Sequence, residues 1–322
     1  MATIALSRPL PGEFDVPGAT IRSGPERGFA SPAELHDFVR GADAVVTWVS
    51  ERVDDAFLDA AGPQLKVVAN FAVGYDNIDV KACRARGVIV TNTPDAVTEG
   101  TADMAWALLL AAARRVGEGD RFVRSGAWAG HGILGPTEFI GRPLAGRTLL
   151  IVGAGRIGYA TALRSLGWGM RVLYVARSAK PQFEFAPLNA TRVELDEGLT
   201  RADFVSIHVP LTPETRHLID ARRLALLRPT TVLVSTARGP VIDEAALVEA
   251  LQRGDLFAAG LDVFEQEPRI HPGLAMLDNV VMTPHCGSAN ERSRGMMTAL
   301  CAANVRAVLA GEPPVTEVGS RD

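Results

Sequence analysis

The stretch TLLIVGAGRIGYA, residues 148–160, decides the fold class of this chain. An apolar, β-branched run precedes a glycine-rich turn, and a helical segment follows it. Gly153, Gly155 and Gly158 stand in the spacing GxGxxG. In this spacing the first glycine allows a tight turn, the second lets the backbone approach a pyrophosphate, and the third lets helix and strand pack closely. The N–H groups and positive dipole end at the helix start then face the phosphates. The stretch therefore predicts a dinucleotide-binding unit.

The second strand of this unit, RVLYV at 171–175, is followed by side chains that bear on the choice of cofactor. Units that bind NAD place a carboxylate here for the ribose 2′-hydroxyl, and a carboxylate would repel the 2′-phosphate of NADP. The chain instead has Ala176, Arg177 and Ser178, with Lys180 close behind. A guanidinium fork, a hydroxyl and a second cation suit a phosphate. We expect NADP(H) to be preferred, with NAD(H) possible; the alternative is a surface arginine without a ligand.

Apolar runs alternate with helical stretches on both sides of this unit, which indicates parallel α/β architecture. Between the two sets lies an Ala/Leu-rich helix at 98–115, with Thr98 as a candidate N-cap and Gly117 beyond its end, and then a loop at 125–146. The length and apolarity of this helix suit a position between two domains. The first set comprises strands at 43–49, 65–71 and 88–91 and helices at 31–40 and 52–61. The second comprises strands at 148–152, 171–175, 203–208, 231–235, 257–261 and 280–283, and helices at 156–166, 220–226, 243–252 and 289–311.

This pattern predicts an α/β chain with two doubly wound parallel-sheet domains of Rossmann-like or flavodoxin-like type. The last helix has to return across the domain boundary, so the second domain is inserted in the first. We expect a substrate-binding domain at 1–98 plus 287–322 and a dinucleotide-binding domain at 99–286. The inference that the last helix returns to the first domain rests partly on the resemblance given below.

Composition bounds the possible partners. The 322 residues are 47% hydrophobic and 22% charged with a net charge of −4, which suits about two soluble domains and no nucleic-acid partner. Cys83, Cys286 and Cys301 lack metal-ligand spacing and are interpreted as free thiols, so no metal is expected. The longest apolar run, 104–113, is half the roughly 20 residues of a membrane span, and MATIALSRPL is no secretory signal. We expect a cytoplasmic protein without a membrane partner.

Three later stretches carry candidate catalytic side chains just after predicted strands. VLVSTARGPVID at 232–243 contains Arg238, AAGLDVFEQEP at 258–268 contains Asp262 and Glu267, and VVMTPHCGSA at 280–289 contains His285. Ligands of open α/β sheets bind beyond the carboxyl ends of the strands, so these side chains should share one edge.

The three residue types suit reversible reduction of a 2-keto acid. An arginine fork holds a substrate carboxylate and polarises the neighbouring carbonyl, and an imidazole exchanges a proton near neutral pH. A carboxylate on the other ring nitrogen would orient the imidazole and raise its pKa. Taken singly, Glu267 could be a turn residue and His285 a buried hydrogen-bonding group. The other histidines are interpreted as structural or surface groups: His36, His131, His208, His217 and His271.

Together these stretches resemble the D-isomer-specific 2-hydroxyacid dehydrogenase family, and most of all its glyoxylate/hydroxypyruvate reductase branch. The likeness runs from about residue 43 to 317 and includes ANFAVGYDNID, TEGTADMAWALLL, GAGRIG, STARGPVIDEAAL, GLDVFEQEP and TPHCGSA. It implies a catalytic Arg238, Glu267 and His285, and a loop that binds the substrate carboxylate through the backbone of Val73 and Gly74. It implies cofactor contacts from Thr101, Gly153, Gly155, Arg156, Ile157, Gly158, Ala176, Arg177, Ser178, Lys180, Val209, Pro210, Thr215, Thr236, Ala237, Arg238, Asp262, His285 and Gly287, with Asp262 on the nicotinamide carboxamide.

The resemblance also implies a homodimer built through the cofactor domain and hinge closure of the cleft. Two departures are Ser235, where the family has an Asn-type residue, and Cys286, where it has an apolar residue. The thiol of Cys286 is expected to make the site sensitive to oxidants. Two other functions remain open. One is reduction of bulkier 2-keto acids of the phenylpyruvate type, decided by Trp48, Val49 and the loop around Trp128. The other is a cofactor-sensing corepressor-like binding protein.

Overall fold

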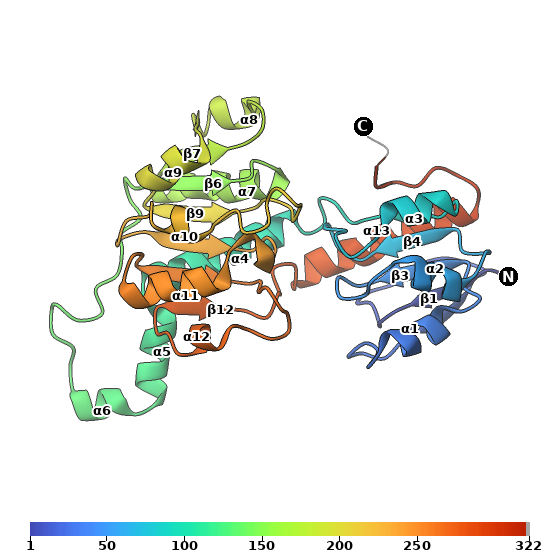
Figure 1. The fold of residues 1–322 in the computed structure, drawn as a ribbon, viewed down its shortest axis with the longest axis horizontal. Helices are drawn as coiled ribbons and strands as arrows, with labels where there is room; N and C mark the ends of the chain where they lie inside the picture. Colours follow the sequence, from blue (N-terminus) through green and yellow to red (C-terminus); the bar gives the residue numbers. More distant parts are fainter. Residues whose placement is uncertain (320–322) are drawn as a thin grey trace. The chain divides into compact units, whose positions relative to one another are not determined.

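The computed structural model describes residues 1–319 (Figure 1). The chain divides into two compact units. Unit 1 comprises Met1–Val97 and the chain from Ser288 onward, and unit 2 comprises Thr98–Gly287. The boundaries predicted at 98/99 and 286/287 each lie one residue away from these. No helix within residues 1–319 has the length and apolarity needed to cross a membrane.

Unit 1 is built on a parallel sheet with the strand order β2-β1-β3-β4-β5. The strands are β1 (Thr3–Leu6), β2 (Thr20–Ser23), β3 (Ala44–Thr47), β4 (Val67–Asn70) and β5 (Ile89–Thr91). The helices are α1 (Pro32–Val39), α2 (Asp55–Ala61), α3 (Val80–Ala85) and α13 (Glu291–Leu309). Every residue of β3 and β4 is buried, as expected of central parallel strands covered on both faces. Helix α13 packs on β4, β3 and β5, so the C-terminal segment of the chain and its N-terminal segment form one domain.

Unit 2 is built on a parallel sheet with the order β12-β11-β10-β9-β6-β7-β8. Its order reverses between β6 and β9, which is the switch point where doubly wound folds bind ligands. The strands are β6 (Thr148–Val152), β7 (Arg171–Val175), β8 (Thr191–Arg192), β9 (Phe204–Ile207), β10 (Val232–Ser235), β11 (Ala258–Leu261) and β12 (Val280–Met282). The helices are α4 (Thr98–Ala113), α5 (Val116–Arg124), α6 (Ala127–His131), α7 (Arg156–Arg164), α8 (Pro181–Glu184), α9 (Leu195–Arg201), α10 (Ala221–Leu224), α11 (Glu244–Arg253) and α12 (Pro272–Ala275), with 3₁₀ turns η1 (Ser165–Trp168) and η2 (Gly239–Val241).

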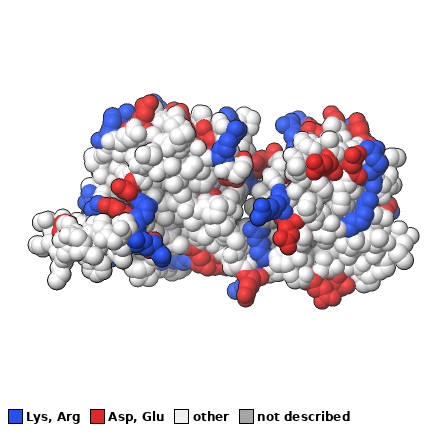
Figure 2. Space-filling view, turned by 90° about the horizontal axis from the view of Figure 1, so that it is seen from below, with Lys and Arg blue, Asp and Glu red and all other residues white. Residues whose placement is uncertain are grey.

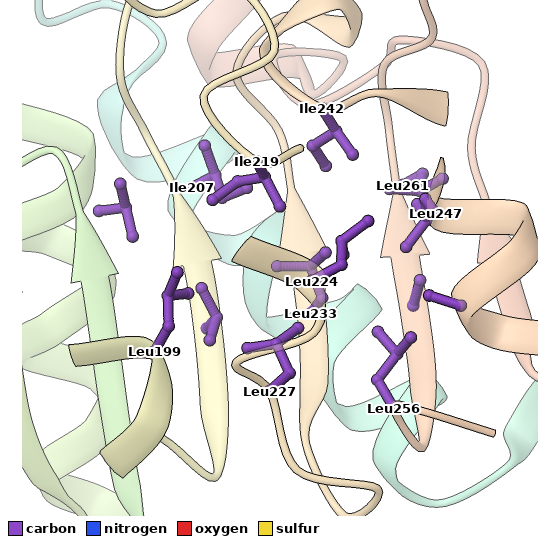
Figure 3. Close-up of a cluster of buried hydrophobic side chains, with 14 of the residues drawn as sticks. Leu199, Ile207, Ile219, Leu224, Leu227, Leu233, Ile242, Leu247, Leu256 and Leu261 are labelled. Atoms are coloured by element: carbon purple, nitrogen blue, oxygen red, sulfur yellow. The ribbon is translucent and has the colours of Figure 1, made fainter. Parts of the chain in front are cut away.

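The core of unit 2 covers both faces of this sheet. Successive residues of β6 point to opposite faces, so Leu149 and Ile151 belong to one apolar cluster and Leu150 to the other. Figure 3 shows the second cluster, in which Leu233 of β10 and leucines of helices α9, α10 and α11 meet. The rigid sheet that results holds the loops at its carboxyl edge, where the candidate site lies.

The predicted fold class, two parallel-sheet α/β domains, is confirmed. Several local predictions were wrong. Thr98 is the first residue of α4 rather than its N-cap, and Gly117 lies inside a second helix, α5. Helix α4 stops early because Arg115 adopts a left-handed conformation with φ 56°. The predicted loop at 125–146 contains α6. The short elements β1, β2, β8, α8, α9 and α12 were not predicted.

Candidate active site

The glycine-rich turn after β6 has the geometry that a pyrophosphate requires. Gly153 has φ 104°, and a Cβ there would lie 2.8 Å from the backbone of His208 and Val209. A Cβ on Gly158 would lie 2.2 Å from the Gly153 carbonyl oxygen, so only glycine allows α7 to pack this closely. Gly155 is the N-cap of α7 and has no side-chain cap, and a Cβ there would meet no atom within 4 Å. The start of α7 is therefore open at Gly155, where the first turn of the helix, with Arg156 and Ile157, begins.

A second observation fits a bound dinucleotide. The hydroxyl of Thr236, just after β10, is buried and makes no hydrogen bond within residues 1–319. An unpaired buried hydroxyl is costly unless a ligand completes it. Ala237, another residue expected to contact the cofactor, directly follows Thr236. The other residues expected to contact the cofactor also lie at or beside the ends of strands. Val209, Pro210 and Thr215 lie in the loop after β9, and Thr101 of α4 approaches Gly287.

The backbone of the loop after β7 is held by hydrogen bonds with Arg192 and Tyr174, and the side chain of Arg177 faces solvent. Arg192 donates to the carbonyls of Ala176 and Arg177, at 3.0 and 3.2 Å. The N–H of Lys180 donates to the Tyr174 hydroxyl at 2.9 Å. Arg177 and Ser178 are exposed and Lys180 is half-buried. Sequence reasoning missed Arg192, because a contact with carbonyls fifteen or sixteen residues away leaves no local pattern.

His285 and Glu267 form a hydrogen-bonded pair at the carboxyl ends of β12 and β11. His285 Nδ1 lies 2.7 Å from Glu267 Oε2, and the Phe264 N–H donates to Glu267 Oε1 at 2.9 Å. Burial opposes ionisation of Glu267, but the hydrogen bond from His285, its charge, the Phe264 N–H and the charge of Arg238 outweigh burial and hold the pKa of Glu267 below its ordinary value. The pair therefore favours a carboxylate on Glu267 at neutral pH, with Nε2 of His285 left for another partner.

Asp262 fixes the loop that carries His285. This carboxylate is 1% exposed, and its Oδ1 accepts the Thr283 hydroxyl at 2.6 Å and the Cys286 N–H at 2.9 Å. Its Oδ2 accepts the Gly287 N–H at 2.8 Å. These bonds enclose His285, which has φ 50° and needs a surrounding structure to hold that conformation. Asp262 thus anchors the loop, a role that sequence reasoning did not assign.

Arg238 lies on the loop between β10 and η2, beside the Glu267 loop. Its Nη1 donates to the Ala237 carbonyl at 2.9 Å, and its charge contributes to the lowered pKa of Glu267. The neighbouring Gly239 permits this arrangement, since a Cβ there would lie 1.9 Å from the Phe264 carbonyl. The structure therefore brings Arg238, Glu267 and His285 together at one edge of the unit 2 sheet.

Other expectations have mixed outcomes. Burial together with Asp262 raises the pKa of Cys286, so its thiol stays protonated, and the expected sensitivity to oxidants loses its physical basis. Desolvation lowers the pKa of His208 to about 3, and the ring of His208 is hydrogen-bonded to the Ser206 hydroxyl.

Val73 and Gly74, the residues expected to bind the substrate carboxylate, lie in unit 1, in the loop after β4. Among residues 1–319, no three His, Cys, Asp or Glu side chains cluster as metal ligands would.

Fold and site together define a dehydrogenase that uses a nicotinamide nucleotide. Residues 106–287 match the family model described as D-isomer specific 2-hydroxyacid dehydrogenase, NAD binding domain. The chain belongs to the D-isomer specific 2-hydroxyacid dehydrogenase family. It is 53% identical to a glyoxylate reductase of Thermococcus onnurineus over 285 residues, which cover 88% of this chain and 85% of the relative.

Solved structures agree. A protein of Thermus thermophilus superposes with a TM-score of 0.91 at 43% identity, over 98% of this chain and 99% of the other. An NADPH-dependent glyoxylate/hydroxypyruvate reductase of Sinorhizobium meliloti, solved with NADP and malonate, superposes with a TM-score of 0.83 at 32% identity, over 99% and 97% of the two chains.

Proposed function

We propose that this chain reduces small 2-keto acids, glyoxylate and hydroxypyruvate, with NADPH, and that hydroxypyruvate yields the D-2-hydroxy acid. The observation that carries the proposal is the 2.7 Å contact between His285 Nδ1 and Glu267 Oε2 beside Arg238, on the same sheet edge as the glycine-rich turn. The glyoxylate reductases among its relatives support the choice of substrate.

Each catalytic residue has a distinct task in this reaction. When bound, the nicotinamide supplies a hydride for the keto carbon. Arg238 binds the substrate carboxylate and polarises the keto group, and the backbone N–H groups of Val73 and Gly74 bind the same carboxylate. His285 donates a proton from Nε2 to the keto oxygen, because Nδ1 is engaged by Glu267. Glu267 orients the ring and stabilises the imidazolium that must form again before the next turnover.

The preference for NADPH rests on the loop after β7. Arg177, Ser178 and Lys180 offer two cations and a hydroxyl where a carboxylate would select NAD. Each charge-assisted hydrogen bond to the 2′-phosphate contributes about 1.5–3 kcal/mol, so a single such bond favours NADPH by roughly tenfold to somewhat over a hundredfold. The Sinorhizobium relative that was solved with NADP supports this assignment.

We also propose a cytoplasmic homodimer built through unit 2. The support is an arm formed by α5, α6 and the segment up to Ile140, which projects from the sheet (Figure 1). Trp128, Ile133 and Ile140 are exposed on it, Ile133 to 95%, and Glu138 is the one charged residue of 125–141. The end of the arm beyond α5 accordingly shows few charges at the left of Figure 2, whereas charges of both signs lie on other parts of unit 2. A second copy would cover these apolar side chains.

A panel assay tests the proposal against its alternatives. Loss of NADPH or NADH absorbance is followed with glyoxylate, hydroxypyruvate and phenylpyruvate, and the chirality of the glycerate product is determined. We expect efficient turnover of the two small acids with NADPH and formation of D-glycerate. Preference for phenylpyruvate would favour the bulkier substrate class. Cofactor binding without turnover of any acid would favour a cofactor-sensing binding protein, and preference for NADH would refute the cofactor assignment.

A further inference from the structure

In unit 1, the carbonyls of three consecutive residues in the loop after β4 are all held by neighbouring segments. The N–H of Thr93 donates to the Ala72 carbonyl at 2.9 Å. The side-chain amide of Asn92 donates to the Val73 carbonyl at 2.8 Å, and that of Asn70 donates to the Gly74 carbonyl at 2.7 Å. Such a run is unusual for a surface loop, in which carbonyls commonly face water.

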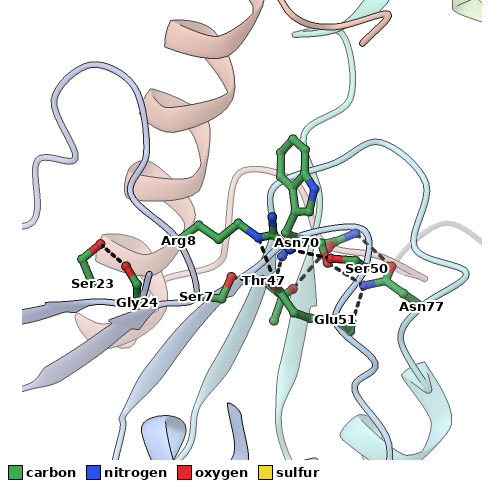
Figure 4. Close-up of polar contacts among 10 residues, drawn as sticks. Ser7, Arg8, Ser23, Gly24, Thr47, Ser50, Glu51, Asn70 and Asn77 are labelled. Carbon is green, nitrogen blue, oxygen red and sulfur yellow. Dashed lines mark hydrogen bonds and ion pairs between the residues drawn. The ribbon is translucent and has the colours of Figure 1, made fainter. Parts of the chain in front are cut away.

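The two asparagine side chains are themselves fixed. Asn70 is fully buried at the end of β4, and its Oδ1 accepts the Thr47 hydroxyl at 3.1 Å (Figure 4). Its amide nitrogen is therefore left to donate to the Gly74 carbonyl. The backbone carbonyl of Asn92 accepts the Thr316 hydroxyl at 2.7 Å, and Asn304 of α13 holds Thr316 through two further bonds at 2.8 and 2.9 Å. Both amides are therefore in place before any ligand arrives.

The direction of these carbonyls determines the direction of the next N–H groups. In a trans peptide the C=O of one residue and the N–H of the following residue point in opposite directions. Because the carbonyls of Ala72, Val73 and Gly74 point to their donors, the N–H groups of Val73, Gly74 and Tyr75 point away from them. In the described part of the chain, none of these three N–H groups donates a hydrogen bond. Successive backbone N–H groups without a protein acceptor can together form a cradle that binds an anion.

We infer that Asn70 and Asn92 are positioning residues for the substrate carboxylate, and that the Tyr75 N–H extends the cradle of Val73 and Gly74. Neither asparagine side chain touches the substrate: each turns a peptide group so that its N–H faces the ligand. This inference rests on the proposed function, since it takes a 2-keto acid as the ligand. It predicts that the asparagines set the affinity for the carboxylate and leave the chemical step and cofactor binding unchanged.

Asn70→Asp and Asn92→Asp test it, because a carboxylate of the same shape cannot donate to the loop carbonyl and repels it. We expect KM for glyoxylate and Kd for oxamate to rise about tenfold or more, as loss of a buried donor implies, with kcat and the Kd for NADPH within about twofold of wild type. Asn279→Asp is the matched control, since Asn279 likewise donates to a backbone carbonyl, that of Phe257 at 3.2 Å, but in unit 2. It should leave KM unchanged.

A measurement on the wild-type protein covers the case in which the buried Asn70 variant does not fold. Oxamate added to ¹⁵N-labelled protein saturated with NADPH should shift the backbone amide signals of Val73, Gly74 and Tyr75. Unshifted signals, a fall in kcat without a rise in KM in Asn92→Asp, or an equal effect of Asn279→Asp would overturn the inference. If these amides respond to oxamate but no 2-keto acid is turned over, the cradle stands and the proposed function fails.

Discussion

The chemistry of the site depends on which atoms of two residues meet. Glu267 engages Nδ1 of His285, so Nε2 is the nitrogen that can act on a substrate. Sequence reasoning placed both residues at strand ends and proposed the pairing, because each follows a recognisable apolar run. It could not show that Asp262 is committed to the His285 loop, because that role depends on three bonds made after folding.

Glu267→Gln should leave measurable activity but move the alkaline limit of keto-acid reduction to lower pH. His285 has to carry a proton to donate it, and removal of the carboxylate makes the imidazolium less stable. We expect the alkaline limit of the kcat/KM profile to lie at lower pH in the variant than in wild type. Glu138→Gln is the control, because Glu138 pairs with His131 at 3.0 Å on the arm. An unchanged limit in Glu267→Gln would refute the pairing as a functional one.

The same pair predicts a dependence of stability on pH. The pKa of Glu267 is lowered in the folded state from an ordinary value of 4.5, so its contribution is fully present above that pH and disappears as the pH falls through the lowered value. The difference in unfolding free energy between wild type and Glu267→Gln should therefore shrink as the pH falls below about 4.5. Denaturant unfolding at several pH values measures it, and a difference that grows on acidification contradicts the account.

Arg177→Ala should reduce the preference for NADPH. Loss of one charge-assisted bond to the 2′-phosphate predicts a fall of roughly ten- to hundredfold in kcat/KM for NADPH, with kcat/KM for NADH little changed. Arg171→Ala, at the other end of the same strand and also exposed, is the control. Equal losses with both cofactors would show that Arg177 does not read the phosphate.

At the scale of the elements, close backbone contacts place the loops. Gly158 brings α7 against β6, and Gly239 brings the Arg238 loop against the Glu267 loop. Sequence reasoning identified Gly158 because the GxGxxG spacing has a known mechanical meaning. It had no reason to single out Gly239, because that contact joins loops from two different strands. Short elements such as β8 were missed for a related reason, since a two-residue strand has no periodicity to recognise.

Gly158→Val should disrupt both packing and cofactor binding. A side chain there meets the Gly153 carbonyl at 2.2 Å and has to push α7 away from β6. We expect lower thermal stability and a loss of NADPH affinity by titration. Gly167→Ala is the matched control, because it adds a Cβ with no atom within 4 Å. If Gly158→Val binds NADPH as wild type does, the cofactor does not depend on this helix start.

At the scale of the whole molecule, the alternation of apolar and helical stretches was sufficient to predict two parallel α/β domains. The domain boundaries rested partly on the family resemblance, and they lie one residue from the division into two compact units. The alternation was not sufficient to predict the arm. Helix α5 has an amphipathic pattern although it buries no residue in this chain, so sequence reasoning could have found it, whereas the five-residue α6 is too short to show a helical period.

Ile133→Asp should weaken the proposed dimer. Ile133 is 95% exposed, so the change costs the isolated chain little, but a charge in a covered apolar surface is costly. Light scattering coupled to size exclusion should show a dimer for wild type and a shift to monomer for the variant. Met276→Asp is the control, because Met276 is 83% exposed and lies outside the arm. A wild-type monomer, or a variant that stays dimeric, would contradict the role of the arm.

The most direct test of the catalytic assignment is the rate of glyoxylate reduction by NADPH in wild type and His285→Gln. Loss of the proton donor should lower kcat by about 10²–10⁴-fold, while Kd for NADPH, measured by fluorescence titration, stays near the wild-type value. A variant that binds NADPH normally and still turns over glyoxylate at close to the wild-type rate would contradict the account.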